Sequence, residues 1–501
     1  MEEDIIYGKK RHLFGGLEPS NMLSFEARKI NGSVYLNVVL PKDTEIDGQL
    51  LVTVAGAIIR KSETDYPKDE FDGELVADVS EDGLYLDETN TRDRVWYYAA
   101  FPYSDQGVYN RSDTNRTLCE PFNYIYGYDI DLNDSDPATR VRYPDDVDNS
   151  GDFKPAYMDY TSGVFNYGDW TIDPGYDFMP KPCMLTDAGI VDHYLDPNNY
   201  SLMEDGVTPS RVSDLTFNGN AMMEWPKIYT KRWEENGVYH FRCSSTKIDE
   251  DYECWCNYDK SQTVKDHFYT SIYPMTTSIH RSISGYAPYS NTSYNELKSY
   301  MSTLSSGWSL DIITHRLLIQ DLLVMMAKNT DTQTSYGYGY ATNDTNSPMS
   351  GGSLNKKGLF WGSNSYINSV KVFGMEHWWN NLSRFNEGSI VDNAGNLKLF
   401  NPKTGEYTNN VRPDSQRIGY IKSCMLYNIG RLPSDIGGSG STFECDYFYM
   451  RGVTGLFYYP TCGRSIDTSQ YTTASGAFAI DFSITNDGTI HKYLGSGLTF
   501  I

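Results

Sequence analysis

The stretch that decides the fold of this chain is Val370-Lys371-Val372-Phe373-Gly374-Met375-Glu376-His377-Trp378-Trp379-Asn380-Asn381. It follows the only long helical pattern in the sequence. It precedes a C-terminal run that ends Tyr493-Leu494-Gly495-Ser496-Gly497-Leu498-Thr499-Phe500. Together the two segments indicate the tight turn and the closing strands of a loop-rich domain that serves as a binding platform. The chain therefore has the pattern of a recognition protein rather than of a catalyst.

Length and composition narrow the class of protein. At 501 residues the chain exceeds a single core, which favours two or three domains. The net charge of −24 repels phosphate backbones and anionic lipid, so we expect no nucleic-acid binding and no membrane-surface binding. The 41 tyrosines suit contact surfaces, because a tyrosine ring gives large contact area at low entropic cost. The alternative is that tyrosine and glycine only mark a β-rich, loop-rich architecture.

Targeting signals and metal-binding cysteine patterns are not found in the sequence. The first residues lack the charged, apolar and small-residue pattern of a signal peptide, which predicts synthesis in the host cytoplasm. The longest apolar stretch, 317–326, is interrupted by Gln320 and Asp321 and is too short to span a bilayer, so we expect no membrane insertion. Of the eight cysteines only Cys254 and Cys256 are closely spaced, which favours reduced structural thiols over a metal site.

The chain divides into three segments by pattern. Residues 1–21 lack periodicity and indicate a short N-terminal arm or anchoring tail. Residues 22–116 contain short alternating strands separated by turn signals, which predicts a β-sandwich. Residues 117–501 form a larger domain with a β-rich insertion at about 130–290, and a helical pattern runs from about 310 to 328. The predicted fold class is mainly β with a few helices (α+β).

Acidic turns are the best candidates for a metal site, and neither matches a calcium loop. In a loop that starts at Asp129, the sixth position is Asp134 rather than glycine and the twelfth is Arg140 rather than glutamate. The segment 146–152 has glycine at the sixth position but Tyr157 at the twelfth. We therefore predict no cofactor, and Ca²⁺ in another geometry stays an open alternative. Phosphate-binding, zinc-protease and nucleophile motifs are also missing, so we predict that the protein is not an enzyme.

The segment around Gly374 resembles the G-I-E-x-x-W-G-N segment of C-type-lectin-fold proteins. These are the formylglycine-generating-enzyme-like domains of phage tail fibres and of variable proteins that retroelements diversify. The matching residues, which form the fold signature, are Gly374, Glu376, Trp379 and Asn381. The chain departs from the pattern at Met375, at Asn380 and at 383–385. In addition, the segment 95–107 resembles the penultimate strand of fibronectin type III modules and the loop after it, which implies that the 22–116 sandwich is fibronectin III-like.

Downstream segments resemble virion proteins from phages of gut bacteria. The similar stretches are 443–449, 463–465, 475–478 and 493–500, and segments 155–160 and 220–226 also look like such chains. In the receptor-binding proteins of this fold, the variable side chains lie between the stretch that corresponds to 463–465 and the last strand. The resemblance implies candidate ligand-binding residues Tyr449, Asp467, Gln470, Tyr471, Asn486, Asp487 and His491, with Ser469, Ser483 and Thr485 in the same window.

The resemblance implies a phage virion protein, a tail-fibre or tail-tip component that binds a bacterial surface glycan or protein without covalent chemistry. We expect a homo-oligomer, with a trimer favoured, whose N-terminal region contacts other virion proteins. Two alternatives stay open. One is a capsid-decoration, head-fibre or baseplate protein. The more remote one is a tail enzyme that degrades glycans.

Overall fold

The computed structural model describes residues 16–30, 33–89, 94–121, 124–170, 178–277, 279–341, 347–392, 394–410, 417–450, 458–463, 475–485 and 493–501. Of these described residues, 42% lie in strands and 7% in helices, so the chain is mainly β, as the sequence predicts. No helix among these residues is both long and apolar enough to cross a membrane. The chain divides into two compact units, with the boundary between Asn123 and Tyr124.

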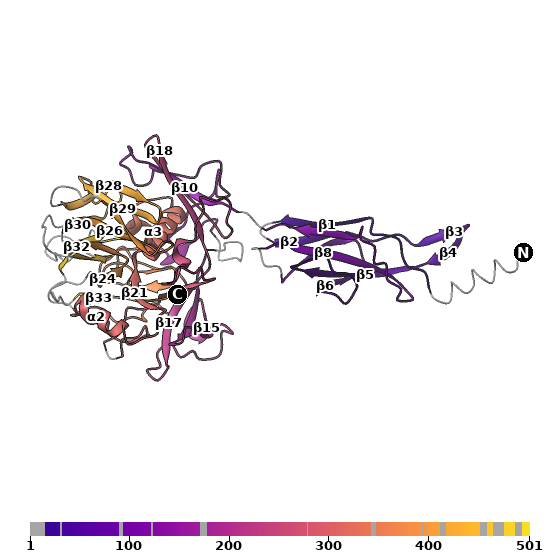
Figure 1. The fold of residues 1–501 in the computed structure, drawn as a ribbon, viewed down its shortest axis with the longest axis horizontal. Helices are drawn as coiled ribbons and strands as arrows, with labels where there is room; N and C mark the ends of the chain where they lie inside the picture. Colours follow the sequence, from indigo (N-terminus) through magenta and orange to yellow (C-terminus); the bar gives the residue numbers. More distant parts are fainter. Residues whose placement is uncertain are drawn as a thin grey trace, which may run out of the picture. The chain divides into compact units, whose positions relative to one another are not determined.

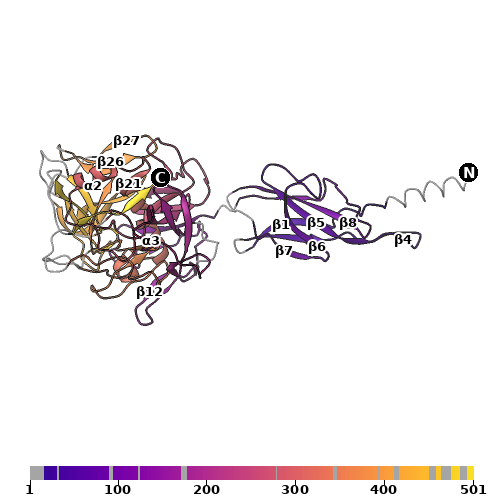
Figure 2. The same ribbon diagram turned by 90° about the horizontal axis from the view of Figure 1, so that it is seen from below.

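The first unit contains two β-sheets and a hairpin (Figures 1 and 2). One sheet has the strand order β1-β2-β7 and the other has the order β6-β5-β8-β9. Strand β2 alternates between buried and half-buried residues, and its buried side chains are Val34, Leu36 and Val38. The strands are β1 (Ser24–Ile30), β2 (Ser33–Val39), β3 (Thr44–Ile46), β4 (Gln49–Val52), β5 (Val54–Ser62), β6 (Glu74–Val79), β7 (Gly83–Leu86), β8 (Trp96–Ser104) and β9 (Arg116–Cys119).

The predicted end of the first domain, residue 116, is a few residues too early. Strand β9 begins at Arg116 and pairs with β8, so that Trp96 lies opposite Cys119. It also contacts the other sheet, because the Ala27 amide donates to Thr117 Oγ1 at 3.2 Å. The pairing therefore assigns β9 to the first unit.

The second unit combines a long network of paired strands, running from β14 to β34, with a four-stranded sheet of order β11-β10-β19-β18 and two hairpins. Its first strands are β10 (Tyr126–Asp131), β11 (Val141–Arg142), β12 (Tyr157–Asp159), β13 (Val164–Asn166), β14 (Lys181–Thr186), β15 (Val191–Asp196), β16 (Asn199–Met203), β17 (Gly219–Trp225), β18 (Tyr229–Glu235), β19 (Val238–Ser244) and β20 (Phe268–Ser271).

The later strands are β21 (Trp308–Ile312), β22 (Lys371–Val372), β23 (Met375–Glu376), β24 (Ser383–Glu387), β25 (Ser389–Val391), β26 (Leu397–Asn401), β27 (Glu406–Asn410), β28 (Arg417–Tyr427), β29 (Gly430–Ile436), β30 (Tyr447–Met450), β31 (Tyr458–Cys462), β32 (Ile480–Thr485), β33 (Leu494–Gly495) and β34 (Leu498–Phe500). The helices are η1 (Trp255–Asn257), α2 (Tyr294–Met301), α3 (Ile313–Ala327) and α4 (Thr332–Tyr336).

Helix α3 lies inside the second unit, surrounded by strands in both views (Figures 1 and 2). All fifteen of its residues are buried, as in a core helix, although five of them are polar: Thr314, His315, Arg316, Gln320 and Asp321. Several of its buried polar side chains are hydrogen-bonded to the surrounding backbone, whereas His315 Nδ1 and Arg316 Nε have no partner among the described residues. Gln320 Nε2 donates to the Ala477 carbonyl at 2.7 Å. The helix is therefore the centre of the core on which the surrounding strands pack.

The predicted helix at about 310–328 begins too early. Residues 308–312 form strand β21, which pairs with β34 on one side and with β24 on the other. Because both flanking strands offer backbone hydrogen bonds, the extended conformation is favoured there, and the helix begins only at Ile313. By contrast, the start of α2 is set by local sequence, because Ser293 and Glu296 form a capping box there.

Candidate functional site

The fold-signature residues lie in the interior and organise the second unit. Phe373 and Gly374 form the turn of the β22–β23 hairpin, in which Val372 lies opposite Met375. Both turn residues have positive φ, 46° and 80°, as a tight two-residue hairpin requires. A Cβ atom on Gly374 would lie 2.5 Å from Met223 Sδ and from Tyr200 Oη. Glycine is therefore required at this turn by both backbone geometry and space.

Glu376 fixes a neighbouring loop through its carboxylate. Its Oε2 accepts from the Gly352 amide at 2.8 Å and its Oε1 accepts from the Leu354 amide at 3.0 Å. The other buried charge of the hairpin, Lys371, donates to the Leu354 carbonyl at 3.0 Å. Burial raises the pKa of Glu376 and lowers the pKa of Lys371, while the attraction between the two groups opposes both shifts.

Trp379 and Asn381 complete the same anchor. Trp379 Nε1 donates to the Gly337 carbonyl at 2.9 Å. The side-chain amide of Asn381 makes two hydrogen bonds to the backbone of Met349. Its Oδ1 accepts from the Met349 amide at 2.7 Å, and its Nδ2 donates to the Met349 carbonyl at 3.0 Å. Helix α3 reaches this segment through Arg316, whose guanidinium lies 4.9 Å from the Trp378 ring. The signature thus holds the scaffold together from within and presents no side chain to a ligand.

Only one of the seven predicted ligand-binding residues falls in the described part of the chain. Tyr449 is half-buried on β30, between Ile418 of β28 and Asp481 of β32. Of the neighbouring window, Ser483 and Thr485 belong to strand β32. The other predicted residues, Asp467, Gln470, Tyr471, Asn486, Asp487 and His491, and also Ser469, lie outside the described residues.

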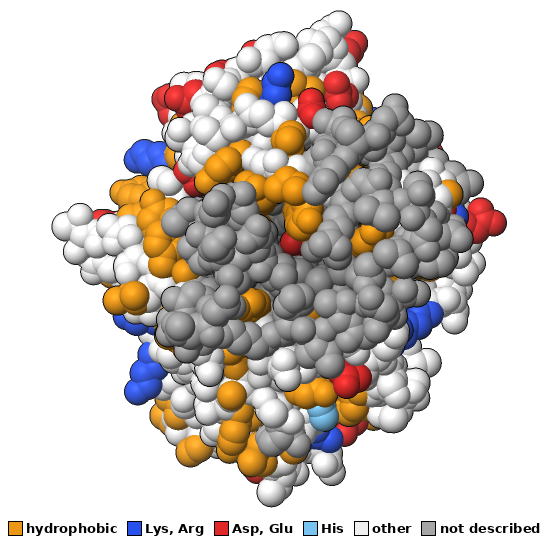
Figure 3. Space-filling view, turned by 90° about the vertical axis from the view of Figure 1, so that its left-hand side faces the viewer, with side chains coloured by type: hydrophobic (Ala, Val, Ile, Leu, Met, Phe, Trp, Pro, Cys, Tyr) orange, Lys and Arg blue, Asp and Glu red, His pale blue; other side chains and the backbone are white. Residues whose placement is uncertain are grey.

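A cluster of half-exposed aromatic side chains lies beside strand β32. We call it the tyrosine platform and define it as Tyr294, Phe400, Tyr407 and Tyr459. The rings of Tyr294 and Tyr459 stack at 3.8 Å, and those of Phe400 and Tyr407 meet edge to face at 5.5 Å. Tyr459 lies opposite Ile484 of β32, and Tyr407 is 44% exposed. Hydrophobic side chains, tyrosines included, gather at several places on the described part of the face that carries α2 and strands β24–β33 (Figure 3).

The phenols of the platform stay protonated at neutral pH. Burial, and then the nearby Glu387 carboxylate, raise the pKa of Tyr294 and of Tyr407. A neutral phenol both donates and accepts a hydrogen bond. Glu387 itself is held in place, because it pairs with Lys298 at 2.9 Å and accepts from the Leu310 amide at 3.0 Å. The platform therefore offers apolar ring faces and neutral hydroxyl groups beside the Glu387–Lys298 ion pair.

No pattern in the sequence points to this platform. Its members come from α2, β26, β27 and β31, which are separated by up to about 165 residues. No local pattern connects tyrosines at such distances, and the chain contains 41 of them.

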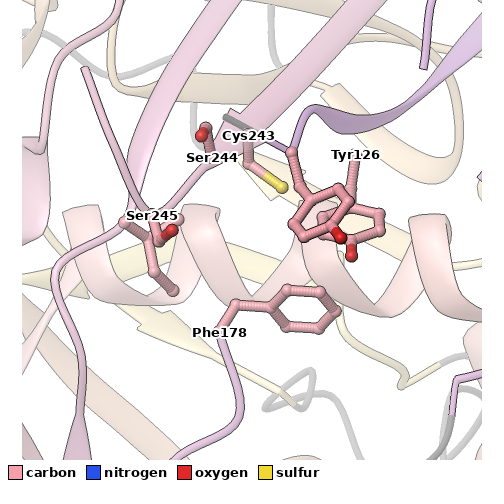
Figure 4. Close-up of a pocket in the computed structure, with 7 residues that line it drawn as sticks. Tyr126, Phe178, Cys243, Ser244 and Ser245 are labelled. Carbon is pink, nitrogen blue, oxygen red and sulfur yellow. The ribbon is translucent and has the colours of Figure 1, made fainter. Parts of the chain in front are cut away.

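The cavity in Figure 4 is too small for an organic ligand. It lies beside Tyr126, Phe178 and Cys243 and offers about 10 Å³, which is roughly the space of one water molecule. Burial raises the pKa of the Cys243 thiol, so the thiol is not an activated nucleophile. None of the eight cysteines, all of which are described, forms a disulfide, and Cys445 and Cys462 are buried. Burial likewise raises the pKa of both.

The acidic turns use their carboxylates within the protein. Asp129 pairs with Arg242 at 3.0 Å and contacts His240 at 2.8 Å. Asp134 and Asp136 accept hydrogen bonds from backbone amides of their own turn. Within the described ranges no cluster of three or more His, Cys, Asp or Glu side chains could hold a metal ion.

Two comparisons with known proteins give no match. No protein-family model matches the chain, and no curated protein is significantly similar to it.

Proposed function

We propose that the chain is a bacteriophage virion protein, a tail-fibre or tail-tip component that binds a bacterial surface receptor without covalent chemistry. The observation that carries the proposal is the tyrosine platform. Rings held by a helix and three strands lose little freedom on binding, and stacking on Tyr459 fixes Tyr294 in advance. Such rings accept the apolar face of a sugar, and their neutral hydroxyls and Glu387 bond to its hydroxyl groups.

The organisation of the chain supports the same proposal. In the first unit, a three-stranded sheet of order β1-β2-β7 and a four-stranded sheet of order β6-β5-β8-β9 agree with a fibronectin III-like spacer. In the second unit, the buried turn at Gly374 and the closing strand β34 agree with a C-type-lectin-fold domain. In this proposal the N-terminal region attaches to other virion proteins. A single shallow site binds weakly, so clustering in a homotrimer would supply the avidity.

Binding to an array of bacterial surface polysaccharides tests the site. Tyr407→Ala removes the most exposed ring of the platform. We expect it to weaken binding by roughly tenfold or more, as for an aromatic contact worth about 1–3 kcal/mol. Tyr157→Ala is the matched control, because Tyr157 is a strand tyrosine of similar exposure, 49%, in the β12–β13 hairpin. Equal binding by both variants would reject the platform as the receptor site.

The place on the particle tests the virion role. An antibody against the protein should label the distal tail of intact particles. Uniform labelling of the capsid would instead support the decoration alternative, and labelling of neither would reject a virion role.

A further inference from the structure

A buried pair of opposite charges joins the two sheets of the first unit. Lys61 lies on β5 of the four-stranded sheet, and Asp87 directly follows β7 of the three-stranded sheet. Lys61 Nζ lies 2.9 Å from Asp87 Oδ1 and 3.0 Å from Asp87 Oδ2. Both side chains are completely buried, at 0% exposure. The backbone also fixes Asp87, because its amide donates to the Val34 carbonyl at 2.9 Å.

An aromatic ring covers the pair, and one carboxylate and two hydroxyl groups lie within reach of it. The Trp96 ring lies 4.2 Å from Lys61 Nζ. The Tyr98 hydroxyl donates to Asp87 Oδ2 at 2.7 Å. Glu74 Oε1 lies 3.9 Å from Lys61 Nζ and accepts a hydrogen bond from Thr89 Oγ1, which also lies 3.3 Å from Asp87 Oδ1. A chain of hydrogen-bonding groups thus leads from the amine through Glu74 and Thr89 to the carboxyl group.

We propose that Lys61 and Asp87 condense to a side-chain amide, an isopeptide bond that covalently joins the two sheets. Reacting atoms held at roughly 3–3.5 Å in one orientation gain a large effective concentration. An ion pair taken out of water is also costly, whereas a neutral amide in the same place carries no such penalty. Both effects favour the bond at this position, and the inference is independent of the proposed receptor-binding function.

The step balances without a further reactant. Glu74 accepts a proton from the Lys61 ammonium, and the neutral amine attacks Cγ of Asp87. Thr89 relays the proton from Glu74 to Asp87 Oδ1, while the Tyr98 hydroxyl stabilises the charge that develops on Oδ2. The C–Oδ1 bond breaks, Nζ loses its second proton to the leaving oxygen, and one water molecule departs. No oxidant, reductant or cofactor takes part.

A surface pair in the same chain provides an internal control. Lys227 Nζ lies 3.0 Å from Asp266 Oδ1, the same separation as in the buried pair. Those two side chains are 28% and 86% exposed. Water solvates both charges there, so the proposal predicts that this pair stays unreacted.

Mass spectrometry of the purified full chain tests the bond. We expect the denatured protein to be lighter than its sequence by one water molecule. After cleavage behind glutamate, a branched peptide should join residues 46–63 to residues 82–88, and Lys227 should appear only in linear peptides. The full sequence mass, with linear peptides at both sites, would overturn the proposal.

Two variants separate this reaction from other losses of water. Lys61→Arg keeps the positive charge and should restore the full mass. If it does not, the missing water comes from another step, such as ring closure at Asp72-Gly73, and the proposal is wrong. Glu74→Ala changes a half-exposed side chain, at 47% exposure, and should delay the loss of water in freshly made protein. Undiminished bond formation in Glu74→Ala would overturn the role assigned to Glu74.

Discussion

Replacing Glu376 by alanine should strongly destabilise the second unit. The change removes the acceptor of the Gly352 and Leu354 amides and leaves Lys371 buried without its partner. Each buried amide left without an acceptor costs about 1–3 kcal/mol, and the buried Lys371 also loses the attraction of the Glu376 carboxylate. The two costs overlap, because Lys371 can give up its proton. We therefore expect the free energy of unfolding to fall by about 3–5 kcal/mol.

Denaturant unfolding followed by tryptophan fluorescence is the appropriate assay. Of the nine tryptophans, only Trp96 lies in the first unit, so the signal reports mainly on the second unit. Glu376→Gln keeps the shape of the side chain and one acceptor oxygen. Its free energy of unfolding should therefore lie between those of the wild type and of Glu376→Ala. Glu250→Ala is the surface control, because Glu250 is 95% exposed in its pair with Lys247, and it should change stability by less than about 0.5 kcal/mol. A loss below about 1 kcal/mol for Glu376→Ala would show that the signature segment does not anchor the 349–355 loop.

Burial lowers the pKa of His315 to about 4, below its value of about 6.5 in the unfolded chain. The neutral imidazole therefore contributes stability that is fully present above pH 6.5. About 3 kcal/mol of this stability is lost as the pH falls toward 4. In unfolding measurements across this range, His315→Gln should flatten the decline, and an unchanged profile would contradict the assignment. Asp321→Asn should lower the free energy of unfolding by about 3–5 kcal/mol, measured with denaturant. The reason is that Asp321 pairs with the buried Arg232 at 2.8 Å and accepts a hydrogen bond from the Tyr128 hydroxyl at 2.7 Å. Thiol titration should detect eight reactive cysteines in denaturant. In the native protein it should detect at most Cys424, which is partly exposed. Rapid reaction of several thiols in the native protein would refute their burial.

Local patterns in the sequence were sufficient for several elements. The tight turn at Gly374 was predictable because glycine adopts the positive φ of such a turn more readily than other residues do. The start of α2 was predictable because Ser293 and Glu296 bind the first turn of the helix itself. In each case the interaction partners lie within a few residues of one another.

Other features depend on partners that are distant in sequence. Residues 310–312 belong to the helical pattern of the sequence, and only the pairing of 308–310 with β34, about 190 residues downstream, makes this segment a strand. The boundary of the first unit moved past 116 for the same reason, because β9 pairs with β8.

The sequence by itself determined that this protein is mainly β and that its turn at Gly374 is tight, because these properties follow from periodicity and backbone preference. Only the tertiary structure brought Tyr294 against Tyr459 and Lys61 against Asp87. Hydrogen bonds and ring contacts between distant residues depend on how sheets pair and pack. A sequence pattern covers only a few neighbouring residues and does not contain that information.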